Sequence, residues 1–228
     1  MTQRLALVTG ASRGIGAAIL KALSECENTI VIGTATSDVG AQRITERCQQ
    51  RGVQGRGYVL DVTDALSIDT LLEALRADYG FLPSVLVNNA GITQDNLAIR
   101  MKADEWSKVI ETNLSAVFYL SQKLLRPMLK QRWGRIINIG SVVGSTGNPG
   151  QVNYCAAKSG LLGFSRALAL EVARRQVTVN VVSPGFIQTD MTDALSEDQK
   201  AHILERIPSG RMGQCEEVAA LVGFLVSD

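Results

Sequence analysis

Six short apolar runs recur along the chain, each followed by a longer segment in which apolar residues repeat at helical spacing. The runs are rich in Val, Ile and Leu, and their alternation with helices predicts a parallel sheet covered on both faces. We therefore expect an α/β fold, a doubly wound parallel sheet in three αβα layers. The predicted strands are Arg4–Thr9, Thr29–Thr34, Gly57–Leu60, Val85–Asn88, Arg135–Ile139 and Thr178–Val182, and the predicted helices are Ala17–Glu25, Ala41–Arg51, Ser67–Tyr79, Asn113–Gln131, Asn153–Arg174 and Glu216–Val226.

One segment interrupts this alternation. Residues 184–213 are polar and punctuated by Pro and Gly, and they directly follow the sixth predicted strand. Ligands bind at the carboxyl ends of strands in open α/β sheets, so this segment is predicted to be a substrate lid. With 228 residues, 46% of them hydrophobic, and no repeat or linker, residues 1–228 are predicted to form a single domain. We expect no seventh strand within these residues, although such a sheet could accommodate one.

Composition excludes several classes of function. The 23 Lys and Arg residues nearly balance 22 Asp and Glu, so the net charge of +1 predicts neither nucleic-acid nor membrane binding. No signal peptide or membrane span is expected, and the four cysteines, without a C-x-x-C pair, are typical of reduced thiols in a cytoplasm. With a single histidine, His202, the chain offers little for a zinc site or a catalytic triad, and no metal is expected.

The first strand leads into a glycine-rich turn, Thr9-Gly10-Ala11-Ser12-Arg13-Gly14-Ile15-Gly16, and then into a helix. Glycines allow a tight turn and let the backbone approach a pyrophosphate, while a helix N-terminus offers free N–H groups to it. A lone glycine cluster is a weak signal, but this one lies at the first strand-to-helix turn of a six-strand pattern. It predicts a Rossmann-type dinucleotide site.

The end of the second strand favours NADP(H) over NAD(H). NAD sites place a carboxylate there to bind the ribose hydroxyls, whereas the strand end of this chain, Gly33-Thr34-Ala35-Thr36-Ser37, has no acidic residue until Asp38. Arg13, in the glycine loop, is placed to pair with a 2′-phosphate. The alternative is that Arg13 is only a solvated loop residue.

Two residues on one predicted helix and two outside it suggest the chemistry. Tyr154 and Lys158 lie one helical turn apart on one face, and an ammonium there would lower the pKa of the phenol. Ser141 ends the preceding strand, where its hydroxyl could hydrogen-bond a carbonyl. Asn113 lies inside a helical stretch, an unfavourable place for an amide. A serine hydrolase is excluded, because the sequence around Ser141 is not G-x-S-x-G and has no suitable histidine.

Together, the glycine loop, Asp61-Val62, Asn88-Asn89-Ala90-Gly91 and the four polar residues resemble the short-chain dehydrogenase/reductase family over Arg4 to Asp228. The resemblance implies that Tyr154 donates a proton, Ser141 orients the carbonyl, Lys158 holds the nicotinamide ribose, and Asn113 seats a water that relays protons. It implies that the cofactor contacts Gly10, Ser12, Arg13, Gly14, Ile15, Gly16, Thr34, Asp61, Val62, Asn88, Ala90, Gly91, Tyr154, Lys158, Pro184, Gly185, Ile187 and Thr189.

Three segments, residues 91–97, 139–144 and 184–192, resemble the bacterial reductases of β-ketoacyl-acyl-carrier-protein in fatty-acid synthesis. That resemblance implies an acidic carrier-protein partner met by Arg132 and Arg175 beside the active-site entrance, although basic residues at helix ends are also favoured by the helix dipole. It further implies a homotetramer whose dimers form through helices 113–131 and 153–174. Cys155 replaces a small residue of the family and is expected only to pack.

Two other functions stay open. A related enzyme could use the same residues on acyl-CoA or on another ketone or alcohol, because this fold serves many substrates. A protein that binds NADPH without turnover is the second alternative, and the intact set of four polar residues argues against it.

Overall fold

All six predicted strands form, and they join into one parallel sheet in the order β3-β2-β1-β4-β5-β6. The structure is a computed structural model that describes residues 3–189, 201, 203–205 and 207–227. The strand order reverses between β1 and β4, so the sheet is doubly wound as predicted. The strands are β1 (Arg4–Val8), β2 (Thr29–Ala35), β3 (Gly55–Val59), β4 (Val85–Asn88), β5 (Gly134–Ile139) and β6 (Val177–Val182).

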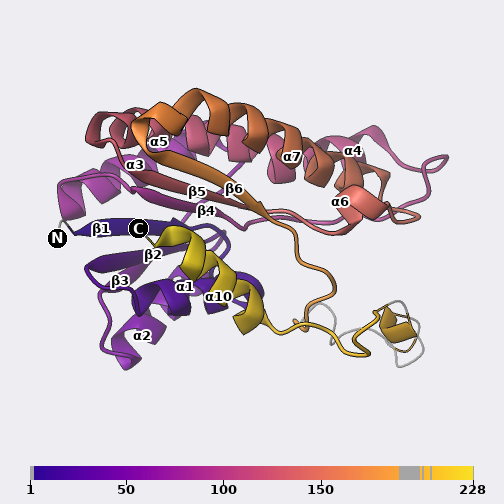
Figure 1. The fold of residues 1–228 in the computed structure, drawn as a ribbon, viewed down its shortest axis with the longest axis horizontal. Coiled ribbons are helices and arrows are strands. Elements are labelled where there is room, and N and C mark those ends of the chain that lie inside the picture. Colours follow the sequence, from indigo (N-terminus) through magenta and orange to yellow (C-terminus); the bar gives the residue numbers. More distant parts are fainter. Residues whose placement is uncertain (1–2, 190–200, 202, 206, 228) are drawn as a thin grey trace.

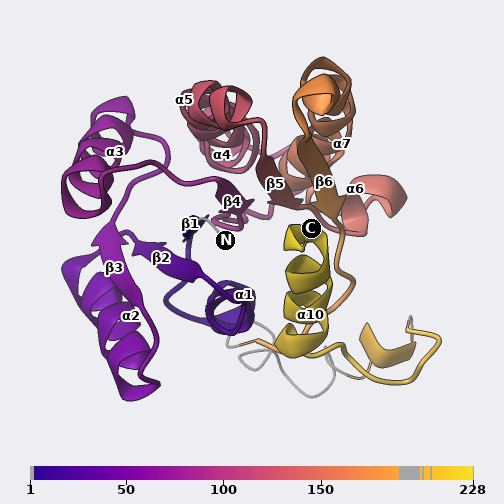
Figure 2. The ribbon, with the colours of Figure 1, turned by 60° about the vertical axis from the view of Figure 1, so that its left-hand side comes forward.

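Helices cover both faces of the sheet (Figure 1 and Figure 2). One face carries α1 (Gly14–Ser24), α2 (Asp38–Gln50) and α10 (Cys215–Val226). The other face carries α3 (Ala65–Tyr79), α5 (Ala116–Gln131) and α7 (Val152–Val172). The three layers confirm the predicted αβα architecture.

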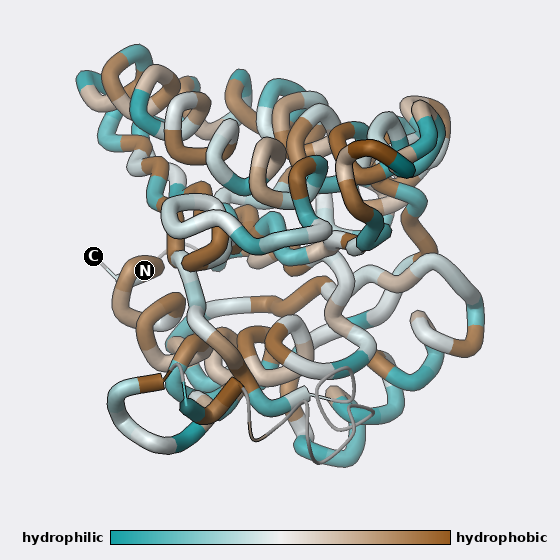
Figure 3. Tube along the Cα trace, turned by 90° about the vertical axis from the view of Figure 1, so that its right-hand side faces the viewer, coloured by the Kyte–Doolittle hydropathy of each residue, from teal (hydrophilic) through white to brown (hydrophobic). Residues whose placement is uncertain are grey.

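The two apolar cores follow from the alternation of side chains along each strand. Ala6 and Val8 of β1 pack toward α1 and α10, while Leu5 and Leu7 pack toward α3 and α5, and all four are fully buried. Figure 3 shows apolar and polar segments alternating along the helices, as expected for helices that cover a sheet on one side only. Because the central strands are buried on both faces, their sequences are continuously apolar.

The predicted helix 113–131 is divided in the structure. A helix α4 (Ala103–Ile110), not predicted from the sequence, runs through a π-helical turn η1 (Glu111–Ser115) into α5. A short α6 (Val143–Thr146) and a 3-10 turn η2 (Ala173–Arg175) were also not predicted. The π-turn coincides with the awkwardly placed Asn113, and its consequence is described with the site.

The predicted lid is closed at its base. Ile187 and Gly213 form a parallel bridge, the Gln188 N–H donates to the Gly213 carbonyl at 2.8 Å, and the Gly213 N–H donates to Phe186 at 2.9 Å. Residues 190–200, like His202, lie outside the described residues, so the lid itself stays a prediction. Within the described ranges, no helix is both long and apolar enough to cross a membrane.

Candidate functional site

The loops after β1 and β4 are bound together at the point where the strand order reverses. The Thr9 hydroxyl, which is buried, accepts hydrogen bonds from the N–H groups of Asn89 and Ala90, both at 3.0 Å. The Asn89 amide in turn donates to the carbonyls of Thr9 and Gly10, at 2.9 and 3.1 Å. The glycine loop is therefore held rigidly against β4 at the sheet edge where ligands bind in this fold.

Two glycines give this loop a shape that fits a dinucleotide. Gly10 has a positive φ of 64°, and a Cβ there would lie 3.0 Å from the Ala90 Cα. A Cβ on buried Gly16 would overlap the Gly10 carbonyl oxygen. The α1 helix begins at Gly14, so its unpaired N–H groups start directly after the loop. These features fit a bound pyrophosphate, and Arg13, exposed at the N-cap of α1, is free of the core.

The end of β2 contains no carboxylate. Thr34 is buried, so its hydroxyl is shielded from solvent, and its carbonyl accepts from the Ala11 N–H at 2.8 Å. The exposed positions are Thr36 and Ser37, and Ser37 caps α2 by accepting from the Gly40 N–H. Direct contact of the Thr34 side chain with a cofactor thus stays a prediction, while the neutral strand end agrees with the sequence.

The predicted adenine-side residues follow β3. Asp61 is exposed, and its carboxylate accepts from the N–H and the hydroxyl of Thr63, at 2.9 and 2.7 Å. Val62 beside it is half-buried. These two hydrogen bonds fix the turn and engage one of the two Asp61 carboxylate oxygens. Asp61 and Val62 border the same sheet edge as the glycine loop.

Asn88 points into the protein rather than toward a ligand. Its amide donates to Asn138 of β5 at 2.8 Å and to Ser121 of α5 at 3.4 Å, and the Asn138 amide donates to Ser165 of α7 at 2.8 Å. All four residues are at most 5% exposed. This buried polar chain fixes β4, β5, α5 and α7 relative to one another, so Asn88 supports the site from below.

Ser141 and Tyr154 form a hydrogen-bonded pair at the carboxyl end of β5. Burial raises the pKa of the Tyr154 phenol, the hydrogen bond with Ser141 lowers it, and the Asp95 carboxylate raises it again. The net effect raises the pKa of Tyr154 above its usual value, contrary to the lowering expected from Lys158 alone. A phenol in this state is protonated at neutral pH and suited to donate a proton.

Lys158 lies beneath this pair. It is 5% exposed, and burial lowers the pKa of its ammonium to about 8. The Nζ atom donates to the Ile139 carbonyl at 2.7 Å and lies 5.4 Å from the centre of the Tyr154 ring. The structure thus brings Lys158, Tyr154 and Ser141 together as predicted.

Asn113 occupies the π-turn and is almost fully buried. Its amide donates to the carbonyls of Ile92 and Val109, both at 2.9 Å, and its oxygen accepts from the Ile92 N–H at 3.2 Å. Its side chain therefore anchors the β4–α4 loop, and the predicted role in seating a water stays a prediction. The amide inside a helical stretch was a valid signal of a special position, since π-turns are frequent at functional sites.

The segment after β6 returns to the glycine loop. The Pro184 carbonyl accepts from the Val142 N–H at 2.9 Å, which joins it to the Ser141 turn. Thr189 lies beside Gly14, since a Cβ on that glycine would be 3.6 Å from the Thr189 methyl group. Gly185 is exposed and Ile187 half-buried between them. The predicted contacts of Pro184, Gly185, Ile187 and Thr189 are therefore compatible with one cleft.

Arg132 and Arg175 lie far from Tyr154 in the same chain. Arg132 is the exposed C-cap of α5 and Arg175 ends η2, so both precede strands and sit at the amino edge of the sheet. Tyr154 is near the start of α7, and the 21 residues of that helix span about 30 Å. Within one chain the fold therefore separates these arginines from Tyr154, and their expected place beside an active-site entrance stays a prediction.

Asn153 is a site residue that the sequence pattern did not indicate. It is fully buried, and its amide donates to the carbonyls of Gln94 and Glu105 at 2.9 and 3.1 Å. Its oxygen accepts from the Tyr154 N–H at 2.8 Å. It thereby ties the start of α7 to the β4–α4 loop. Cys155, next along the helix, is half-buried.

Comparison with known proteins agrees with this geometry. The profile of the short chain dehydrogenase family matches residues 4–200. The chain is 57% identical over its whole length to the 3-oxoacyl-[acyl-carrier-protein] reductase FabG of Haemophilus influenzae, covering 92% of that protein. It is 58% identical to the protein of the same name from Escherichia coli and 57% identical to that from Pseudomonas aeruginosa, each over 99% of this chain and 90% of the relative.

Proposed function

Because this chain belongs to the short-chain dehydrogenase family, we propose that it reduces β-ketoacyl groups on acyl carrier protein to β-hydroxyacyl groups, with NADPH as the reductant. The observation that carries the proposal is the meeting of half-buried Ser141 and Tyr154 with buried Lys158 at the carboxyl edge of the sheet, the edge that also carries the glycine loop. The relatives that share more than half of the sequence are named for this reaction on carrier-protein substrates.

Each step that the protein itself performs is assigned to a residue of this site. NADPH, when bound, supplies the hydride that reduces the carbonyl carbon. The Ser141 hydroxyl orients the carbonyl oxygen, and the Tyr154 phenol gives that oxygen its proton. Lys158, held by Ile139, positions the nicotinamide ribose and provides a positive charge that stabilises the phenolate left after proton transfer. The hydrogen bonds of Asn113 and Asn153 hold the β4–α4 loop in place against η1 and the start of α7.

NADPH is proposed rather than NADH on two grounds. The end of β2 presents no carboxylate to repel a 2′-phosphate, and Arg13 is exposed at the start of α1. Glycines at positions 10 and 16 leave space for the pyrophosphate, which NADPH and NADH have in common.

The carrier-protein contact is proposed to act between subunits. Arg175 lies about 30 Å from the Tyr154 of its own chain, beyond the other end of α7, and Arg132, at the end of α5, lies at the same amino edge of the sheet. Phe118 and Tyr119 of α5 and Leu170 of α7 are exposed apolar residues, at 43%, 45% and 83%, on the helices expected to form a dimer. Antiparallel pairing of α7 with its copy would bring the arginines of one chain to the cleft of the other, within a homotetramer made of two such dimers.

NADPH oxidation with acetoacetyl thioesters of carrier protein and of CoA tests the reaction. Turnover that favours the carrier-protein form, and a fall of about 10²- to 10⁴-fold in Tyr154→Phe, are expected from loss of the proton donor. Ser159→Ala, a hydroxyl removed on the same helix outside the set, serves as the control. Tight NADPH binding without oxidation of either thioester would leave only a binding protein.

A mixing experiment tests the contact between subunits. Subunits with Tyr154→Phe keep both arginines, while subunits with Arg132→Glu and Arg175→Glu keep the tyrosine. If the arginines serve a neighbouring cleft, co-refolded mixtures should regain activity on carrier protein that neither variant has alone. Activity no greater than the sum of the two parents would contradict it.

A further inference from the structure

A strongly basic groove runs away from the glycine loop between α1 and α2. It encloses about 560 Å³ and is lined by five cationic side chains, with Glu216 the single carboxylate among the described lining residues. Thr189, from the segment after β6, closes the end of the groove near Gly14. The cationic residues are Arg13, Lys21, Arg43, Arg47 and Arg51.

Three of these arginines follow one face of α2. Arg43, Arg47 and the C-cap Arg51 are four residues apart, so they lie on successive turns above the groove. Three like charges on one helix face repel each other, which disfavours the helix. A stripe of this kind is explained more readily by an anionic ligand than by stability.

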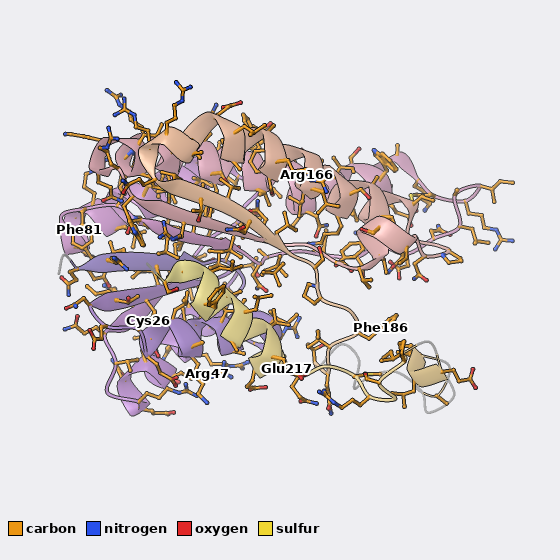
Figure 4. The ribbon with its side chains drawn as sticks, in the orientation of Figure 1. Cys26, Arg47, Phe81, Arg166, Phe186 and Glu217 are labelled. Carbon is orange, nitrogen blue, oxygen red and sulfur yellow. The ribbon has the colours of Figure 1, made fainter. Side chains whose placement is uncertain are left out.

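Arg47 makes direct contact with the cofactor loop. Its Nη1 atom donates to the carbonyl of Ser12 at 2.8 Å, and Ser12 immediately precedes Arg13. Figure 4 labels Arg47 on the lower layer of helices, on the same side of the sheet as α10. A guanidinium has five N–H donors, so one bond to Ser12 leaves others for a ligand. The loop arginine and this α2 arginine thus belong to one connected cluster.

We propose that Arg43 and Arg47 join Arg13 in binding the phosphate monoester on the adenosine ribose, which makes them further determinants of the preference for NADPH. The inference rests on the proposed use of NADPH. Arg43 is one turn closer than Arg47 to the start of α2. The helix begins at Asp38, after Thr36 and Ser37 at the end of β2. Arg51 is one turn beyond Arg47, away from that end, and is assigned no contact.

A dianionic phosphate that lies between Arg13 of the glycine loop and the arginines of α2 would be bound from two sides. Bidentate guanidinium contacts to phosphate are strong and depend on geometry, so lysine cannot replace arginine fully. Each exposed contact is expected to contribute about tenfold in affinity, the lower end for hydrogen bonds to charged groups. Loss of Arg13 alone should therefore weaken the preference for NADPH without abolishing it.

Calorimetric titration with two fragments tests this assignment. Adenosine 2′,5′-bisphosphate carries the ribose phosphate and AMP does not, so their affinity ratio isolates that group. Arg43→Gln and Arg47→Gln should each lower binding of the bisphosphate by about tenfold and leave AMP unchanged. Arg51→Gln is the matched control, since it removes the same charge from the same helix face. At physiological ionic strength a charge beyond about 8 Å is largely screened, so this variant should bind like wild type.

The outcomes separate the two proposals. If the wild-type chain binds both fragments equally, the use of NADPH itself is wrong. If wild type prefers the bisphosphate but Arg43→Gln and Arg47→Gln behave like Arg51→Gln, the added arginines are not determinants. Equal losses for bisphosphate and AMP in Arg47→Gln would also overturn the proposal, because they would show that Arg47 only supports the loop.

Discussion

Replacing Lys158 with methionine is expected to stabilise the cofactor-free protein at neutral pH while removing its activity. The ammonium is almost completely buried, and burial lowers its pKa to about 8 from 10.5. Folding therefore moves a charged group out of water, with the Ile139 carbonyl as a hydrogen-bond acceptor at 2.7 Å. A methionine of similar length fills the same space without a charge.

The size and sign of the effect follow from the two pKa values. The fall of the pKa from 10.5 to about 8 corresponds to about 3 kcal/mol that the charged lysine costs the folded state below pH 8. Between pH 8 and 10.5 the unfolded chain holds this proton while the folded chain has lost it. Stability therefore rises with pH in that window, at up to about 1.4 kcal/mol per pH unit.

Urea denaturation of wild type and Lys158→Met from pH 7 to 10 measures this directly. The difference in free energy of unfolding should favour the variant at pH 7 and shrink as pH rises above 8. Lys158→Arg is the control, because its charge does not titrate and its difference from wild type must change with the same slope. A difference that stays constant with pH would refute the idea that burial depresses the pKa of Lys158.

Three further predictions concern the surroundings of the site. Ser141→Ala removes the hydrogen bond that lowers the pKa of Tyr154, so the alkaline fall of the pH–rate profile should move to higher pH, with kcat about 10²-fold lower. Gly16→Ala places a methyl group against the Gly10 carbonyl and should cost about 1–3 kcal/mol by urea denaturation and weaken NADPH binding in fluorescence titration. Asn138→Leu removes the hydrogen-bond partner of buried Asn88 and Ser165 and should lower the free energy of unfolding by about 3 kcal/mol. Adding Ser165→Ala to this variant should lower it little further, which a double-mutant cycle checks.

The sequence predicted the sheet well because apolar runs and strands coincide. The bounds of β4 agree at both ends, Val85 and Asn88, while β3 begins two residues earlier than expected. Two of its positions, Gly55 and Gly57, carry no side chain and so no hydropathy signal. Gly57 is required because a Cβ there would overlap the backbone of Ala41 in α2. Close helix-to-strand packing, rather than hydrophobicity, therefore determines the residue type at this position of β3.

The helices were harder to predict where hydrogen bonding changes type. A π-turn adds one residue to a helical turn, and apolar spacing alone does not distinguish it from a continuing α-helix. The only local signal was Asn113, whose amide bonds Ile92 and Val109. Likewise, the direction in which the pKa of Tyr154 shifts depends on how deeply the side chain is buried. The spacing of residues along the sequence does not indicate that depth. Residue identity predicted which groups meet, and packing determined their protonation.

The position of the two predicted carrier-protein arginines follows from topology alone. In a parallel sheet every strand ends at the same edge, so the glycine loop, Asn88 and Ser141 gather there. Each covering helix runs back toward the opposite edge before the next strand begins. Residues that end such helices, as Arg132 and Arg175 do, are therefore separated from their own chain's site by a helix length. In the proposed complex, a carrier protein bound to these arginines would serve the cleft of another copy, so the proposed pairing of α7 with α7 would contribute to substrate delivery as well as to assembly.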